Sequence, residues 1–368
     1  MSDRDHARAG QPPVCAEDFA RLAADRLPAG IRDFVDGGSG DESVQAANRA
    51  ALDRVRILPR ALSGVADADP AARLVAGDAA MPVAVAPMAY QRLLHPDGEL
   101  AAARAAAGAG VPYVISTLSS VALEDIAAAA APTWFQLYWL RDRALVLDLV
   151  RRAETAGCEA LMVTVDVPVM GRRLRDLRNG FALPDSVSAA NLGTGPTAVT
   201  HTRHAGRSAV AAHTSAVFDP ALSWADLEWL RAHTELPLVV KGVLDPRDAA
   251  RAAGLGADAV VVSNHGGRQF AGAVASITAL PLVRDAVPDS CAVLLDSGIR
   301  TGTDVLRALV CGADGVLYGR PVLWGLAADG EKGVSAVLGL LRAELQEALV
   351  LSGCPDLAAA RGLATVRA

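Results

Sequence analysis

Eight short apolar segments recur along the chain, each followed by a stretch rich in Ala, Leu, Arg and Glu. Near-continuous apolar strands that alternate with helices predict a parallel sheet covered by helices. Eight such units predict a closed (β/α)8 barrel, the TIM barrel, rather than an open sheet. The segments are MPVAVAP (81–87), VPYVIS (111–116), TWFQLYW (133–139), ALMVTVD (160–166), PLVVKG (237–242), AVVVSN (259–264), AVLLDSG (292–298) and GVLYGRP (315–321).

The length and composition of the chain are compatible with this fold. A closed α/β barrel can hold 368 residues, so we expect a single domain over residues 1–368. Hydrophobic residues make up 52% of the sequence but aromatic residues only 4%, so the core must consist mainly of Ala, Val and Leu. Small helices packed on buried aliphatic strands produce such a core.

Charge, hydropathy and cysteine usage argue against several classes of protein. A net charge of −6 argues against a nucleic-acid binder, which needs a basic face. No apolar run reaches the roughly 20 residues of a membrane span. Residues 1–14 are polar, lack the apolar centre of a signal peptide and are expected to be disordered. The five cysteines are scattered without a CxxC pair, so the sequence predicts neither a metal site nor disulfides and favours a cytoplasmic location.

Two segments lie outside the repeating units. Residues 15–80 form an N-terminal extension that begins with two predicted short helices, separated at Pro28 and ended by Gly37 and Gly38. This extension either closes the bottom of the barrel or folds over its top. The connection over residues 185–220, after the fourth strand, is rich in Gly, Thr, Ser and Ala, and a loop of this length is expected to act as a lid.

Barrels of this type carry their active sites at the carboxyl ends of the strands. The seventh and eighth segments end in DSGIR and YGRP, which place Gly298, Arg300, Gly319 and Arg320 at that face. Glycines let backbone N–H groups approach an anion and arginines neutralise it, so these two ends favour a phosphate site. The alternative interpretation is a pair of ordinary turn glycines beside surface arginines.

The sixth segment ends in SNHGGR and supplies a candidate base, His265. Asp166 ends the fourth segment, and a carboxylate beside an imidazole fixes the ring and stabilises its protonated form. Lys241 ends the fifth segment, where burial is costly unless an anion, such as a charged cofactor, lies nearby. Tyr138 ends the third segment and is a candidate substrate hydrogen-bond donor, with core packing as the alternative.

Two further arginines at the same face, Arg173 and Arg268, predict a site that binds a carboxylate in a bidentate manner. For Arg173 the alternative is a solvated basic face, because GRRLRDLR (171–178) holds four arginines. Together with a phosphate site and a base, the pair indicates a phosphorylated redox cofactor, which FMN would fit, and a small acid as substrate. No GxGxxG follows the first segment, so a nicotinamide site is not supported.

SNHGGRQ (263–269) strongly resembles the signature of the FMN-dependent α-hydroxy acid oxidases and dehydrogenases. The resemblance covers nearly the whole chain in the family's order and spacing, through HPDGE (95–99), FQLYW (135–139), TVDVPVMGRR (164–173), RNGFALP (178–184) and GRPVLWGLA (319–327). It implies that His265 is the base paired with Asp166, that Arg173 and Arg268 bind the substrate carboxylate, and that Tyr138 hydrogen-bonds near the α-oxygen.

The resemblance also implies where FMN binds. Lys241 would lie at the N1–O2 edge of the flavin, and the backbone of Pro87, Met88 and Ala89 would pass near N5. The ring would receive hydrogen bonds from Ser119, Gln136 and Thr164, and the ribityl phosphate would be held by Asp296, Gly298, Arg300, Gly319 and Arg320.

Four positions depart from the common pattern of the family. Phe34 stands where many members carry a tyrosine, and Val121 stands where glycolate oxidases have a tryptophan. Both changes favour an aromatic substrate, and Phe34 also resembles the 4-hydroxymandelate-oxidising members, which have Phe there. Met170 is expected as a further substrate contact. Ser297 replaces a usual glycine near the phosphate loop, where its side chain would alter flavin affinity, and Ala271 replaces a frequent aspartate.

The sequence therefore predicts an FMN-dependent (S)-2-hydroxy acid oxidase that converts mandelate or 4-hydroxymandelate to the 2-oxo acid and reduces O2 to H2O2. One alternative is a dehydrogenase with a quinone or protein acceptor. Another is an oxidase of a small aliphatic acid such as lactate or glycolate. An FMN-dependent isomerase of the same fold is disfavoured, because His265 with two arginines does not suit a diphosphate substrate. The expected partners are the small acid and O2, without nucleic acid or membrane, and the expected assembly is a homotetramer.

Overall fold

The computed structural model describes residues 12–193 and 209–367 and confirms the predicted barrel. Eight parallel strands close on themselves in the order β10-β11-β4-β5-β6-β7-β8-β9. Each predicted apolar segment contributes one strand: β4 (Val83–Val85), β5 (Tyr113–Ser116), β6 (Thr133–Tyr138), β7 (Leu161–Thr164), β8 (Leu238–Val243), β9 (Ala259–Val262), β10 (Ala292–Leu295) and β11 (Gly315–Tyr318).

A helix follows each barrel strand before the chain enters the next one. These helices are α5 (Gly98–Gly108), α6 (Leu123–Ala129), α7 (Arg143–Thr155), α10 (Trp224–Arg231), α11 (Pro246–Gly254), α12 (Ser276–Ala286), α13 (Gly302–Val310) and the long α14 (Arg320–Ser352). Helix α14 is interrupted at Asp329 and Gly330, where the backbone leaves helical geometry. No helix in the described ranges is long and apolar enough to span a membrane.

Alternating strand residues build two separate cores. Ala84, Val114, Trp134 and Met162 belong to the cluster inside the barrel, whereas neighbours such as Val83 pack in the larger cluster beneath the helices. The inner cluster also contains Leu74 and Ala79, which come from the hairpin β2 (Ala72–Leu74) and β3 (Gly77–Ala79). This hairpin therefore closes the amino-terminal end of the barrel.

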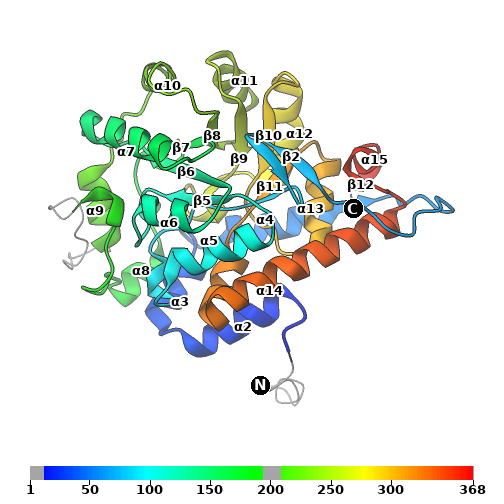
Figure 1. Cartoon of the computed structure of the whole chain (residues 1–368), viewed down its shortest axis with the longest axis horizontal. Helices are drawn as coiled ribbons and strands as arrows, with labels where there is room; N and C mark the ends of the chain where they lie inside the picture. The colour runs from blue at the N-terminus through cyan, green and yellow to red at the C-terminus, as the bar shows by residue number, and fades with distance from the viewer. Residues whose placement is uncertain (1–11, 194–208, 368) are drawn as a thin grey trace.

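The N-terminal extension both closes the bottom of the barrel and folds over its top, the two roles that the sequence left open. Its hairpin closes the bottom of the barrel, and the two predicted helices, α2 (Ala16–Arg26) and α3 (Ala29–Asp36), are separated at Pro28 as expected. Phe34 and Val35 of α3 reach the cavity at the opposite end. A third helix, α4 (Ser43–Arg54), was not predicted, and β1 (Val55–Ile57) after it pairs with β12 (Thr365–Arg367) near the C-terminus. Figure 1 shows α14 running beside α2 and α5 along one side of the molecule.

The connection after β7 is only partly described. It contains α8 (Leu174–Asn179), the 3-10 turn η2 (Ala190–Leu192) and α9 (Ala209–Val217). The centre of the predicted lid, residues 194–208, lies outside the described residues, as do residues 1–11 of the predicted disordered N-terminus. The part that is described does reach the candidate site, because Val210 and Thr214 of α9 line the cavity there.

Candidate active site

A cavity opens at the carboxyl ends of the barrel strands, where the sequence placed the site. Most of the predicted functional residues line it, although they come from α3 and from the ends of seven strands. They are Phe34, Pro87, Met88, Ala89, Tyr138, Met170, Arg173, Lys241, His265, Arg268, Asp296, Gly298, Arg300, Gly319 and Arg320.

His265 and Asp166 form the predicted pair. The Nδ1 atom of His265 lies 3.0 Å from Oδ1 of Asp166, and His265 adopts a left-handed backbone with φ of 58°. Burial lowers the pKa of His265 although the Asp166 charge opposes the shift, so the neutral ring is favoured. Burial would raise the pKa of Asp166, but the charges of His265 and Lys241 hold it below its usual value. The arrangement leaves Nε2 of His265 as the nitrogen available to accept a proton.

Lys241 has a protein anion as its partner. Its Nζ lies 3.4 Å from Oδ2 of Asp296, and this charge with that of Asp166 raises the pKa of Lys241 against the opposing effect of burial. Ser263 links the group, because its hydroxyl donates to Asp296 Oδ2 at 2.5 Å and accepts from Lys241 Nζ at 3.3 Å and from the His265 amide at 3.0 Å. The sequence argument missed Ser263, although it opens the quoted SNHGGR motif.

Arg173 and Arg268 lie together around Phe34. Their guanidinium carbons are 6.0 Å and 5.5 Å from the centre of the Phe34 ring. Burial and the charge of Arg268 lower the pKa of Arg173 to about 9, and its Nε atom has no hydrogen-bond partner in the described part of the chain. This placement argues against the solvated face considered for Arg173. Two crowded cations favour an anionic ligand between them.

Arg300 and Arg320 also line the cavity, and Arg320 shares the carbonyl of Val35 with Arg268. Arg320 donates to the backbone carbonyls of Val35 and Gly266, and burial with the charge of Arg268 lowers its pKa to about 9. Arg300 donates to the carbonyl of Ile299. Within residues 12–193 and 209–367, neither arginine forms an ion pair with a carboxylate. These two cavity arginines therefore favour a phosphate site over the alternative interpretation of ordinary surface arginines.

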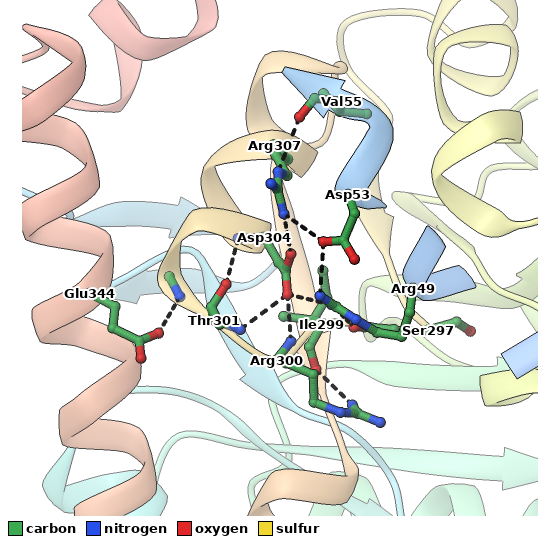
Figure 2. A network of polar contacts seen from close by, with 12 residues as sticks. Arg49, Asp53, Val55, Ser297, Ile299, Arg300, Thr301, Asp304, Arg307 and Glu344 are labelled. Atoms are coloured by element: carbon green, nitrogen blue, oxygen red, sulfur yellow. Dashed lines mark hydrogen bonds and ion pairs between the residues drawn. The ribbon is translucent and has the colours of Figure 1, made fainter. Parts of the chain in front are cut away.

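A buried polar network supports the loop that carries Arg300 (Figure 2). Asp304, which is fully buried, accepts from the amides of Arg300 at 3.0 Å and Thr301 at 3.2 Å. Its two carboxylate oxygens also accept from Arg49 at 2.5 Å and Arg307 at 2.9 Å. Arg49 in turn donates to the carbonyl of Gly298 at 2.5 Å. The loop is thereby held from α4 and α13 together.

Comparison with known proteins agrees with this geometry. The sequence profile described as FMN-dependent dehydrogenase matches residues 23–365. The chain belongs to the FMN-dependent dehydrogenase family. This family uses FMN as its cofactor. The cavity residues Arg300 and Arg320 and the Lys241–Asp296 pair fit this cofactor.

Individual relatives are similar over almost the entire chain. A 4-hydroxymandelate oxidase of Amycolatopsis orientalis is 56% identical over 96% of this chain and 98% of its own length. An L-lactate oxidase of Nostoc sp. is 46% identical over 94% of this chain and 96% of its own length. A solved mandelate oxidase with (S)-4-hydroxymandelic acid is 55% identical, covers 96% of this chain and 99% of its own, and superposes with a TM-score of 0.93.

Five predicted residues of the family site do not line the cavity: Ser119, Val121, Gln136, Thr164 and Asp166, the last of which lies behind His265. Gln136 Nε2 donates to Thr164 Oγ1 at 3.0 Å, and Ser119 Oγ donates to the carbonyl of Val121 at 2.7 Å. Val121 is buried in the core and is not brought to the predicted substrate position. Other residues therefore form the wall of the cavity.

Two of the four positions that depart from the family pattern, Ser297 and Ala271, have different surroundings. Ser297 adopts a φ of 88°, a region that suits glycine, and its hydroxyl accepts a hydrogen bond from the Gly266 amide at 2.9 Å. This bond joins the loop after β10 to the loop of His265. Ala271 lies against Gly40, and nothing in the structure explains the absence of an aspartate there.

Several residues of the cavity wall were not predicted. Thr214 and Val210 come from α9, and Phe218 stacks on Tyr138 with ring centres 4.5 Å apart. These three lie in the connection that the sequence identified only as a lid. Tyr90, which directly follows the predicted cofactor segment 87–89, also lines the cavity.

Proposed function

We propose that this chain oxidises an aryl 2-hydroxy acid, mandelate or 4-hydroxymandelate, to the corresponding 2-oxo acid. The observation that carries the proposal is the cavity that combines the His265–Asp166 pair with Arg173 and Arg268 around the phenyl ring of Phe34. The similarity to 4-hydroxymandelate oxidase and mandelate oxidase supports the same substrate class. FMN, when bound, supplies the two-electron acceptor.

His265 acts as the base in this proposal. Asp166 engages Nδ1, so Nε2 is the atom that removes a proton from the substrate. The carboxylate of Asp166 orients the ring and stabilises it once it is protonated. Tyr138 donates a hydrogen bond near the α-oxygen, and burial supports this role because it raises the pKa of the phenol and keeps it protonated.

Arg173 and Arg268 bind the substrate carboxylate. Arg268 is already held by the backbone carbonyls of Val35 and Gly37, which fixes the direction of its guanidinium group. A fixed planar donor recognises a carboxylate with two parallel hydrogen bonds. Met170 provides an apolar contact for the substrate at the same cavity.

We assign the remaining predicted residues to FMN. Arg300, Arg320, Gly298 and Gly319 would hold the phosphate, with Asp296 at the ribityl chain and Lys241 at the edge of the ring. Pro87, Met88 and Ala89 would contact the ring from β4, while Ser119, Gln136 and Thr164 would contact it from three neighbouring strand ends.

An anaerobic titration tests the proposed reaction directly. Purified holoenzyme is mixed with mandelate, 4-hydroxymandelate, lactate and glycolate, and the loss of oxidised flavin absorbance is recorded. The aryl acids should bleach the flavin fastest. Readmission of O2 should restore the absorbance and release one H2O2 per turnover. Reoxidation by a quinone but not by O2 would replace the oxidase with the dehydrogenase alternative.

The expected assembly and location of the protein are part of the proposal. We propose a homotetramer, which light scattering of the purified holoenzyme would test. A reducing, cytoplasmic environment is supported by Cys158, Cys291 and Cys354, which are buried free thiols.

A further inference from the structure

Tyr90 is held in an unusual conformation at the wall of the active-site cavity. It follows β4 and the segment 87–89 that we assign to FMN, and its backbone is left-handed with φ of 56°. The Tyr90 amide donates to the carbonyl of Leu118 at 3.1 Å, and its own carbonyl accepts from the amide of Leu93 at 3.0 Å. The side chain is only 1% exposed. These bonds hold the Tyr90 backbone in place, and burial encloses its phenol.

The hydroxyl of Tyr90 has no hydrogen-bond partner within the described residues. Tyr113, a nearby tyrosine of equal burial, has one, because its phenol accepts from Gln91 Nε2 at 2.7 Å. A buried hydroxyl without a partner is destabilising, so buried tyrosines normally have one. The Tyr90 hydroxyl is thus both enclosed and unpaired beside the cavity that Tyr90 lines.

The rest of this part of the cavity suits an aromatic ring. Leu94, Leu118 and Phe218 line the same cavity as Tyr90, and the hydroxyl of Thr214 is already donated to the carbonyl of Val210 at 2.8 Å. Burial raises the pKa of Tyr90, and the Tyr138 phenol raises it further. The two phenols are therefore close enough to interact. Apart from the Tyr138 phenol, which we assign to the α-oxygen, the Tyr90 hydroxyl is an unpaired polar group on this apolar wall, which suits a ring that carries one polar substituent.

We propose that Tyr90 determines specificity by hydrogen-bonding the para-hydroxyl group of a 4-hydroxyaryl substrate. This inference rests on the proposed aryl 2-hydroxy acid function and specifies the ring substituent. Mandelate would leave the Tyr90 hydroxyl without a partner, whereas 4-hydroxymandelate would satisfy it. A site built to pair with a substrate hydroxyl discriminates against the analogue that lacks it.

The test compares Tyr90→Phe with wild-type holoenzyme by kcat/KM and by anaerobic flavin reduction. The substitution removes only one oxygen, so kcat/KM for 4-hydroxymandelate should fall about 10-fold while that for mandelate is unchanged or rises. Tyr113→Phe is the matched control, since Tyr113 is equally buried but does not line the cavity, and it should leave the ratio of the two values unchanged.

An unchanged ratio in Tyr90→Phe, with both acids still oxidised, would overturn the role of Tyr90 and leave the proposed function intact. Failure of the wild-type enzyme to oxidise either acid would overturn both. A second measurement does not depend on a variant that must fold: wild-type enzyme should prefer 4-hydroxymandelate to 4-methylmandelate, whose substituent has a similar size. Equal kcat/KM values for these two acids would also overturn the proposal.

Discussion

Asp166 Oδ1 lies 3.0 Å from Nδ1 of His265, although the two residues are 99 positions apart and end different barrel strands. The contact selects one tautomer of the ring and directs Nε2 toward the cavity as the only ring nitrogen without a carboxylate neighbour. Residues from two strand ends thus together give an imidazole with a fixed orientation, which neither segment provides alone.

Replacement of the base should separate chemistry from cofactor binding. His265→Asn is preferable to alanine, because asparagine tolerates the left-handed backbone that His265 adopts. The variant should keep FMN and reduce it roughly 10²–10⁴-fold more slowly with mandelate, the usual contribution of a general base. Stopped-flow absorbance under anaerobic conditions measures the rate. Reduction at the wild-type rate would remove His265 from the mechanism.

The pH dependence of kcat/KM should report the free-enzyme pKa of His265. Burial lowers that pKa from its usual 6.5, so the neutral base persists below pH 6.5 and activity falls as the pH drops through the shifted value. Asp166→Asn removes a charge that raises this pKa. Its acidic limb should therefore move to lower pH, and the plateau should fall because a weaker base accepts the proton. A limb that moves to higher pH would contradict the proposed pair.

Arg268→Lys should weaken substrate binding by about 10- to 100-fold, the range of hydrogen bonds to charged groups. A lysine is a point charge and cannot keep the backbone contacts to Val35 and Gly37 while it also binds a carboxylate through two donors. The dissociation constant for mandelate, from the dependence of flavin reduction on substrate concentration, measures the effect. Arg172→Lys is the control, because Arg172 is exposed and does not line the cavity. Normal binding by Arg268→Lys would refute the carboxylate site.

Arg49 and Arg307 offer a matched pair for the phosphate loop. Both contact Asp304 and Asp53, but only Arg49 also donates to the carbonyl of Gly298. Arg49→Met should raise the dissociation constant of FMN by roughly 10-fold. Arg307→Met should lower thermal stability about as much as Arg49→Met does, but it should change the FMN dissociation constant less. Fluorescence titration of apoprotein with FMN compares them. Equal FMN affinity in the two variants would show that the network stabilises the fold only.

The barrel was predictable because its signal is repeated. Eight apolar segments alternate with helical stretches, and each became one strand of the closed sheet. The position of His265, Arg268 and Arg300 then followed, since the carboxyl ends of parallel strands meet at one face. Helix α4 and the β1–β12 pair were not predicted, because short elements outside the repeat lack a periodic signal.

The details of the site depended on contacts that no single segment reveals. Lys241 was expected to need an anionic partner, for which a charged cofactor was the candidate, and Asp296 from another strand end provides one within the protein. Val121 was expected to face the substrate, yet its side chain is buried in the core. Tyr90 and Phe218 reach the cavity through loop conformations that the sequence pattern does not encode.

Substrate choice should depend on the phenyl ring of Phe34. This ring stacks on Phe181 with centres 4.6 Å apart and an interplanar angle of 12°, so it is fixed as an apolar wall beside Arg268 and Arg173. Burial of an aromatic ring against such a wall contributes about 1.5–3 kcal/mol, which a two-carbon acid cannot gain. The enzyme should therefore prefer mandelate to glycolate by about 10- to 200-fold in kcat/KM.

Phe34→Tyr tests this argument, because it adds a hydroxyl beside the carboxylate site and makes the wall polar. The ratio of kcat/KM for mandelate to that for glycolate should shrink in the variant. Phe270→Tyr is the control, since Phe270 is 73% exposed and should leave the ratio unchanged. Oxygen consumption with each acid provides the measurement. If wild-type enzyme oxidised glycolate as well as mandelate, the aryl assignment would fail, but membership of the FMN-dependent family and the role of His265 would not depend on that result.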